Sequence, residues 1–251
     1  MWKFWRLCRK GLWGIVGWGA WIGQLSAQGL VQEPLPHGLS VAPFLHTYGW
    51  GLSVYVPKWK GPRQGTFWVG DLTSYRTKYE ARTRSAYRDQ GGKNFVFGKL
   101  YYAYLWEVLW GYQYLFAQRG STTPLQMSLQ VGIGPAFTLL KPYYIEVAQP
   151  ISATQAIIQV DTYDPNRYSY YDIVGEADFY LGFDKLRLVP GAVAQVGLMA
   201  DVARTSALIR SLALGVRVQG FTQPIQTLYQ RPGRSWWVAG YMAFYIGNAW
   251  K

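Results

Sequence analysis

The sequence predicts an all-β fold, an antiparallel transmembrane β-barrel of eight strands, with ten strands as the alternative. The first observation is the stretch Leu125 to Phe137 (LQMSLQVGIGPAF), where apolar side chains occupy one parity and polar or small ones the other. This is the two-residue period of a strand with one apolar face, and other segments repeat it. The second is a start typical of an exported precursor. Because only helices and closed barrels satisfy their backbone polar groups in lipid, such strands in an exported chain indicate an outer-membrane barrel.

The first 27 residues have the pattern of a secretory signal peptide. Met1 to Lys10 contains four basic residues, the uncharged stretch Gly11 to Ile22 follows, and the small residue Ala27 precedes a polar one. We therefore expect cleavage after Ala27. The apolar run is shorter than the roughly 20 residues of a membrane span. A retained N-terminal anchor is the alternative, because no further charge occurs through Gln32.

The chain has one cysteine, Cys8, which lies in the basic head. The exported form would therefore have none, which excludes disulfides, thiolate metal sites and a cysteine nucleophile. Cleavage removes four of the 25 basic residues and none of the 13 acidic ones, leaving a net charge of 21 − 13 = +8. That charge suits an anionic lipid surface or acidic glycans. Nucleic acid is disfavoured as a partner, because export removes the usual target and no recognition motif is present.

Aromatic residues make up 18% of the chain, with 20 Tyr and 13 Trp. Tyr and Trp favour the two membrane interfaces, where one part of the ring is buried and the other hydrated. A soluble β-sandwich with an aromatic core is the alternative, but it does not require small and polar residues opposite each apolar face. The chain then divides into a signal peptide (1–27), a periplasmic N-terminal segment (28–43) and the barrel (44–251).

Eight segments carry the strand pattern, most of them long enough for a tilted crossing of about 9 to 11 residues. In chain order they are Phe44–Val56, Gly65–Tyr75, Asn94–Tyr104, Glu107–Gln118, Leu125–Phe137, Leu188–Val202, Ser206–Gly220 and Ser235–Trp250. Pro57 and Gly61 mark the turn after the first, and the polar run Arg119 to Pro124 precedes the fifth. The second alternates poorly, and a tight connection near Leu105 and Trp106 separates the third from the fourth.

An even strand count places both termini in the periplasm. The outer connections are then Pro57–Gln64, Leu140–Arg187 and Phe221–Arg234. The long connection Arg76–Lys93 falls on the inner side, where barrels usually have short turns. The alternative is a barrel of ten strands, with the additional pair at Tyr143–Val147 and Phe179–Leu188.

The polar parity of the strands is expected to face the lumen. These residues are Gln126, Ser128, Gln130, Arg217, Gln219, Tyr241 and Tyr245. Eight strands leave an interior just wide enough for side chains, so we expect a packed polar plug. Because an uncompensated Arg217 would be costly there, the sequence predicts an acidic neighbour, with Asp201 and Glu107 as the candidates.

The connection Arg76–Lys93 is basic and rich in tyrosine. Its basic residues are Arg76, Lys78, Arg82, Arg84 and Arg88. They are candidates for contact with lipid phosphates, such as those of lipopolysaccharide, or with an acidic periplasmic protein partner. The alternative is a solvated loop beside an anionic leaflet.

Two further patterns are candidate sites. His46 and Thr47 resemble the histidine and serine pair of lipid-A deacylases, but no serine follows the histidine directly and no carboxylate can be assigned to it, so we favour a place in the interface girdle. The long outer connection holds several carboxylates that resemble calcium ligands, without a recognisable ligand register. They are Asp161, Asp164, Asp172, Glu176, Asp178 and Asp184. We therefore expect an ordinary exposed loop, no metal and no cofactor.

Several short, mostly glycine-containing stretches occur along the chain: Thr47–Leu52 (TYGWGL), Lys93–Leu100 (KNFVFGKL), Gly132–Pro135 (GIGP) with Leu140–Glu146 (LKPYYIE), Pro190–Gly191 and Phe244–Asn248 (FYIGN). In these stretches the chain resembles an uncharacterised family of outer-membrane β-barrel proteins from Bacteroidota. The chain departs from this family by having aromatic residues where the family tends to be polar. The resemblance implies an outer-membrane barrel, and it implies no activity and no site residue.

Together these patterns favour an integral outer-membrane barrel of a Gram-negative bacterium with a structural or interaction role and no catalysis. The alternatives are a lipid-modifying enzyme of the outer membrane and a narrow porin. An enzyme requires a histidine or carboxylate beside a hydroxyl in a cleft that lipid can reach. A porin requires an open lumen with unpaired charge.

Overall fold

The computed structural model describes residues 34–118, 125–152, 155–203 and 205–251. The predicted signal peptide, with Cys8 and the cleavage point at Ala27, lies outside them. Within these ranges no helix is long and apolar enough to cross a membrane.

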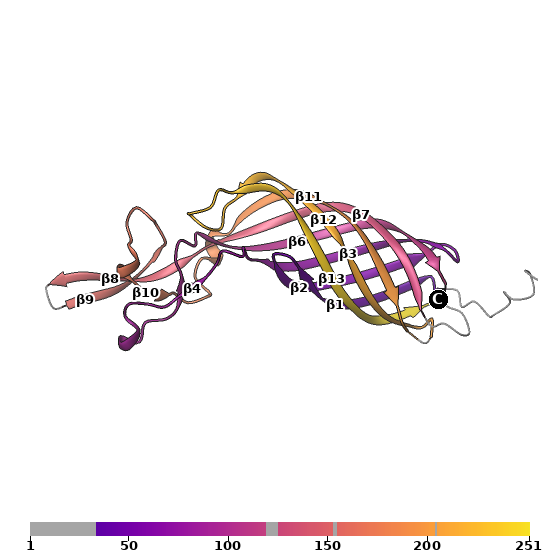
Figure 1. Cartoon of the computed structure of the whole chain (residues 1–251), viewed down its shortest axis with the longest axis horizontal. Coiled ribbons are helices and arrows are strands. Elements are labelled where there is room, and N and C mark those ends of the chain that lie inside the picture. The colour runs from indigo at the N-terminus through magenta and orange to yellow at the C-terminus, as the bar shows by residue number, and fades with distance from the viewer. Residues whose placement is uncertain (1–33, 119–124, 153–154, 204) are drawn as a thin grey trace, which may run out of the picture.

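Eight long antiparallel strands of the described chain form a closed barrel (Figure 1). In chain order they are β1 (His37–His46), β2 (Gly49–Trp59), β3 (Gln64–Tyr75), β6 (Tyr101–Ala117), β7 (Gln126–Pro142), β11 (Arg187–Asp201), β12 (Leu208–Ile225) and β13 (Arg234–Trp250). Each strand pairs with its neighbour along the chain, and β1 closes the barrel by pairing with β13. The predicted fold class and strand number are confirmed.

The predicted strand number is right although two predicted strand boundaries are wrong, because one error merges two strands and the other divides one strand. The predicted first strand, Phe44–Val56, is the hairpin of β1 and β2, with its turn at Thr47 and Tyr48. His46 pairs with Gly49 across this turn, so the parity that faces the lumen changes there, and Phe44 is buried inside the barrel.

The other error concerns the predicted third and fourth strands, which are mostly one strand, β6. Leu105 and Trp106 pair with β7 without interruption. Residues 94–100 precede this strand. The predicted tight connection near Leu105 and Trp106 is therefore wrong, and the carboxylate of Glu107, which follows them, is buried in the lumen.

These corrections move two connections to the opposite ends of the barrel. We call the end where β1 begins and β13 finishes the near end, and the opposite one the far end. The connection 60–63 lies at the near end and the basic connection 76–100 at the far end, so the predicted sides of both were wrong. All long connections now share the far end, as expected for barrels with short inner turns. The barrel also begins at His37, inside the segment 28–43 that was expected to precede it.

The outer surface of the barrel is a band of exposed apolar side chains. One row of cross-strand neighbours runs around most of it: Val56, Trp68, Trp110, Ile133, Ala194, Val218 and Val238. Trp68 and Trp110 are about half exposed. In water such a contiguous surface would be unfavourable, whereas lipid tails cover it. The apolar parity of the strands therefore faces outward, as in barrels that cross membranes.

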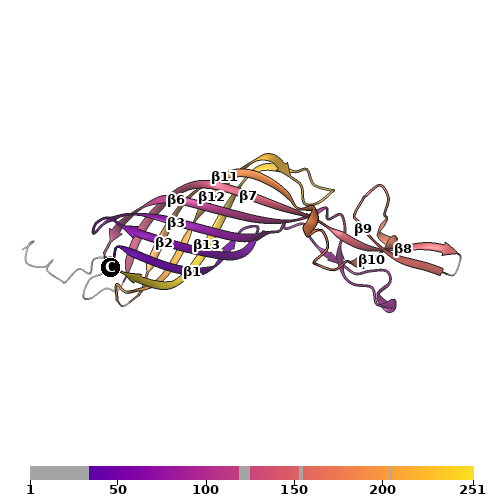
Figure 2. The same ribbon diagram turned by 180° about the vertical axis from the view of Figure 1, so that it is seen from behind.

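The long far-end connections fold into a head that continues along the barrel axis (Figures 1 and 2). It contains the sheet β10-β8-β9, formed by Ile173–Glu176, Tyr144–Ser152 and Gln155–Thr162, and the short pair β4 (Arg82–Thr83) and β5 (Phe95–Val96). Its 3-10 turns are η1 (Arg88–Gln90), η2 (Tyr170–Asp172) and η3 (Phe183–Lys185). The segment expected to give extra barrel strands thus belongs to the head, and the ten-strand alternative is wrong.

The head has a hydrophobic core of its own. Its buried members are Phe95, Tyr143, Ile145, Val147, Tyr163, Tyr168 and Ile173. Burial raises the pKa of Tyr143 to about 12. Its hydroxyl remains protonated at neutral pH and accepts a hydrogen bond from the backbone N–H of Val96 (3.0 Å). This bond joins the connection 76–100 to the connection 143–186.

Buried lysines attach the head to the barrel. Lys99 Nζ lies 2.6 Å from Glu80 Oε2, and both side chains are almost fully buried. Burial lowers the pKa of Lys99, and the Glu80 carboxylate opposes that shift. Lys141, at the end of β7, donates to the carbonyl oxygens of Phe179 (2.6 Å) and Leu181 (3.1 Å). Each lysine thus fixes a head segment at the rim.

Glu80→Gln should loosen the head while the barrel stays folded. The substitution leaves the Lys99 ammonium buried without its carboxylate, which typically costs about 3–5 kcal/mol. We expect faster trypsin cleavage between residues 76 and 100, with unchanged heat-dependent migration of the barrel on gels. Glu146→Gln is the control, because its partner Lys93 is exposed and surface pairs contribute little. Equal cleavage of both variants would contradict the role of the buried pair.

Candidate functional site

The middle of the lumen contains a connected polar network around Arg217. This residue is 1% exposed. Its Nη1 lies 2.6 Å from Glu107 Oε2 and its Nη2 lies 2.5 Å from Asp71 Oδ2, while Nε donates to Gln195 Oε1 (3.0 Å). The contact with Asp71 is an ion pair without an aligned hydrogen bond. The guanidinium carbon also lies 4.4 Å from the ring centre of Phe44.

The predicted acidic neighbour of Arg217 is therefore present, but one candidate was wrong. Glu107 is a partner, whereas Asp201 lies at the near end, where its Oδ1 accepts hydrogen bonds from the backbone N–H groups of Ala203 (2.8 Å) and Arg210 (3.4 Å). Asp71 was missed because β3 has apolar residues at both parities, which hid its inward face.

The structure places all seven predicted lumen residues inside the barrel, each at most 8% exposed. Gln219 donates to Glu107 and accepts from the indole of Trp237. Closer to the near end, Gln130 donates to the hydroxyl of Tyr55 (3.0 Å), and the Tyr245 hydroxyl pairs with Ser53 (2.7 Å). The interior is thus packed, but it is only partly polar, because these groups lie among buried apolar side chains such as Phe67, Leu105 and Leu109.

The ring of Tyr241 requires glycine on the neighbouring strand, β12, and on the strand beyond it, β11. A Cβ at Gly197 would lie 2.3 Å from the hydroxyl oxygen of Tyr241, and one at Gly215 would lie 2.7 Å from the same ring. These two residues give Tyr241 its space in the lumen.

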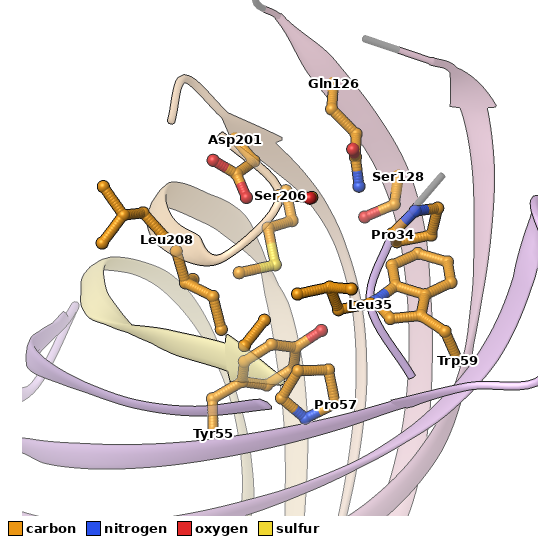
Figure 3. A pocket seen from close by; sticks show the side chains of 13 residues that line it. Pro34, Leu35, Tyr55, Pro57, Trp59, Gln126, Ser128, Asp201, Ser206 and Leu208 are labelled. Carbon is orange, nitrogen blue, oxygen red and sulfur yellow. The ribbon is translucent and has the colours of Figure 1, made fainter. Parts of the chain in front are cut away.

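A small cavity opens at the near end of the plug (Figure 3). Tyr55, Gln126, Ser128 and Asp201 are among the polar side chains that line it, beside Trp59. Its volume of about 40 Å³ suffices for a few water molecules, each of which needs roughly 10–15 Å³ by this measure. It is too small for a lipid or a metabolite.

The five basic candidates Arg76, Lys78, Arg82, Arg84 and Arg88 are exposed at the far end. The connection that carries them contacts the connection 226–233 at the rim. The guanidinium carbon of Arg231 lies 3.9 Å from the ring centre of Tyr79, and Lys78 Nζ lies 5.1 Å from the same ring centre. Arg231 was not among the predicted residues, because only the fold brings the connection 226–233 to this place.

β1 and β2 are short, so the barrel wall is low at their hairpin: it ends there before it reaches the level of the far rim. This leaves a groove in the far rim. β1 ends where His46 pairs with Tyr241, so Arg234–Gly240 of β13 extend beyond it. The groove has a volume of about 630 Å³ and is lined by Tyr48, Gly233, Arg234, Ser235, Trp236, Trp237 and Val238. We call it the rim groove. The backbone N–H of Arg76 donates to the carbonyl of Tyr48 (2.6 Å), which places a second arginine at its border.

The rim groove lies where the apolar band ends. Arg234 has the same parity in β13 as Trp236, which is 65% exposed, so it begins on the lipid-facing side of the wall. Arg76 directly follows the last residue of β3 and is exposed. Recognising the turn at Thr47 and Tyr48 from the following glycine would have revealed the low wall from sequence.

His46 and Thr47 lie beside this groove, but they do not form a nucleophile and base. Thr47 Oγ1 accepts from the N–H of Gly240 (3.0 Å) and caps the exposed edge of β13. His46 Nδ1 accepts from the N–H of Tyr48 (3.3 Å). Its Nε2 has no hydrogen-bond partner among the described residues. Both side chains thus accept hydrogen bonds from backbone N–H groups in or beside the hairpin turn.

The carboxylates of the long connection are dispersed, and most of them have partners in the head. Tyr168 donates to Asp161 (2.5 Å), which is the main cause that lowers the pKa of Asp161. Asp172 caps the turn at Ser169, and Glu176 accepts from Tyr102. No group of three or more ligating side chains suited to a metal occurs within the described ranges.

Comparisons with known proteins give little beyond the fold. No protein-family model matches the chain, and no curated protein matches it. Among solved structures, it is similar to Ail, the attachment invasion locus protein of Yersinia pestis, whose structure was determined in complex with the heparin analogue sucrose octasulfate. The identity is 8%, the TM-score is 0.37, and the match covers 84% of this chain and 95% of Ail. The functional argument therefore rests on the residues of this chain.

Arg217→Gln should destabilise the barrel strongly. Removing the cation leaves Asp71 and Glu107 buried without it, and breaking a buried pair costs about 3–5 kcal/mol. Urea unfolding in lipid vesicles measures the loss. Arg210→Gln, at an exposed position, should change the free energy of unfolding by at most about 0.5 kcal/mol. Adding Asp71→Asn and Glu107→Gln to Arg217→Gln should recover part of the loss. Equal stability of the two arginine variants would contradict this account.

The barrel should not conduct ions. Side chains fill its lumen, and Arg217 is ion-paired in the middle of it. We expect no steady conductance steps after insertion into planar bilayers at 1 M salt. Regular steps from folded protein would contradict the packed plug and favour the porin alternative.

Proposed function

We propose that this chain is an integral outer-membrane protein with a binding role and no catalysis, and that its rim groove holds the anionic headgroup of an outer-leaflet lipid. The observation that carries the proposal is the pair of exposed arginines, Arg76 and Arg234, at the level where the apolar band ends. Lipopolysaccharide phosphates are the ligand that this chemistry favours.

The orientation follows from the topology. Both ends of the barrel sheet lie at the near end with the short turns, which in bacterial barrels face the periplasm. The head and the rim groove then face outward, and the basic residues meet the outer leaflet. This supports the lipid contact that the sequence predicts for the basic connection.

The groove combines the two features that a lipid headgroup requires. A guanidinium can donate two parallel hydrogen bonds to a phosphate, which gives both strength and orientation. Neither Arg76 nor Arg234 has a carboxylate within 4.0 Å among the described residues, so both remain available. Trp236, on the same face of β13 as Arg234, provides an apolar surface for the start of an acyl chain.

A lipid-modifying enzyme is the less favoured function. Such an enzyme would need a hydroxyl activated by His46, and Thr47 Oγ1 is instead bonded to the backbone of β13. If His46→Ala abolished a change in the mass of lipid A that depends on this protein, the enzyme would replace our proposal.

The double variant Arg76→Gln and Arg234→Gln should weaken binding of lipopolysaccharide. Each charge-assisted hydrogen bond contributes about 1.5–3 kcal/mol, so the affinity should fall at least about tenfold for each arginine. The measurement is the shift in unfolding temperature of detergent-solubilised protein as lipopolysaccharide is added.

The control is Lys58→Gln with Lys60→Gln, which removes the same charge at the near end. It should retain the affinity, and the affinity of the unmodified protein should fall as salt rises. An equal loss in both double variants would mean that only net charge matters, and the groove would not be the site.

A further inference from the structure

The strand β9, at the tip of the head, has one unpaired edge. The sheet order is β10-β8-β9, so β9 pairs with β8 on one side only. No backbone group of β9 bonds to another described segment on its other side. An exposed edge of this kind is a template for another strand, and proteins usually block it with lysine, proline or a bulge.

β9 contains no lysine and no proline, and the one irregularity in its pairing lies on β8, between Pro150 and Ser152. The central residues of β9 are apolar and uncovered on both faces: Ile157 and Ile158, which point to opposite faces, are 57% and 60% exposed, and Val160 is 46% exposed. The one charged residue of the strand, Asp161, is bonded to Tyr168 within the head. Burial of this strip requires a partner.

The sequence of β9 is complementary to itself in one antiparallel register. If Ile158 lies on the two-fold axis, it faces Ile158 of a second copy, and Ala156 faces Val160. On the other face Ile157 lies opposite Gln159. Asp161 lies opposite Gln155, so no like charges meet. Directly opposed apolar pairs stabilise antiparallel strands, and a two-fold interface requires this self-complementarity.

The direction of β9 determines where that second copy lies. The β8–β9 hairpin runs along the long axis of the molecule, away from the barrel (Figures 1 and 2). Two copies in the same membrane would therefore present their β9 strands in parallel. Antiparallel pairing requires barrels that point in opposite directions, as they do in two facing membranes.

We propose that β9 pairs edge to edge with β9 of a second copy in an apposed membrane, in the antiparallel register centred on Ile158. The contact joins two three-stranded sheets into one of six strands. One such contact is small, so it is weak between single molecules. Many copies on two facing surfaces reinforce one another, because each contact raises the effective concentration for the next.

The experiment uses the full barrel in two populations of lipid vesicles with different fluorescent labels. The unmodified protein should cluster them, as measured by light scattering and by colocalisation of the two labels. Ile158→Lys places two lysines opposite each other and should abolish clustering, as should Ile158→Glu. Mixing Ile158→Lys vesicles with Ile158→Glu vesicles should restore it, because the opposed residues then attract.

Ile151→Lys is the matched control. It adds the same charge at an equally exposed isoleucine of the same hairpin (62%), but this residue lies on β8, away from the unpaired edge, so clustering should be retained. Clustering by Ile158→Lys alone, no rescue in the mixture, or no clustering by the unmodified protein would each overturn the proposal. The variant Arg76→Gln with Arg234→Gln should cluster normally, which separates this inference from the proposed lipid site.

Discussion

The fold depends on the requirement that every backbone amide at membrane depth has a hydrogen-bond partner. A sheet meets it only when its last strand pairs with its first, as β13 does with β1. Closure with eight strands leaves a narrow lumen, which side chains fill apart from the small cavity at its near end. The inward residues are apolar, aromatic or polar, and a buried charge among them requires an opposite charge. The network of Arg217, Glu107 and Asp71 meets this requirement, and the packed lumen leaves no space for a lipid or a metabolite.

The proposed binding sites therefore lie at the far end, and the unequal lengths of the strands determine their shape. β1 and β2 have 10 and 11 residues, whereas β6, β7 and β13 have 17 and β12 has 18. On the tall side, β7 leads directly into the head. On the low side, the wall ends early and exposes the edge of β13. The head and the rim groove thus have one structural cause.

The alternation of side chains was sufficient to predict the barrel and seven of its inward residues, because the two-residue period is a local property. It was not sufficient for the hairpin at Thr47 and Tyr48. This turn lacks proline and asparagine, and the apolar residues on its two sides give the impression of one strand. The error propagated to the side on which the basic connection lies.

The contacts across the lumen and in the head could not be predicted in the same way. Arg217 meets Asp71 from the opposite wall, and that pairing depends on the register of all the strands between them. The head strands β4, β5 and β10 have two to four residues, too few for a period to be recognised. Their position comes from the shared core around Tyr143.

The lumen, the rim and the tip of the head differ in which chemical groups are left without a bonding partner. This difference determines which ligand or protein each of the three regions can bind. In the lumen the central charge, Arg217, is paired, because an isolated charge there would be too costly. At the rim, Arg76 and Arg234 have water on one side, so they tolerate being unpaired and can select an anion. At the tip the single charge of β9 is bonded within the head, and what remains is a backbone edge with apolar side chains. An edge of that kind selects an extended strand, and the strand that matches its residue order is its own.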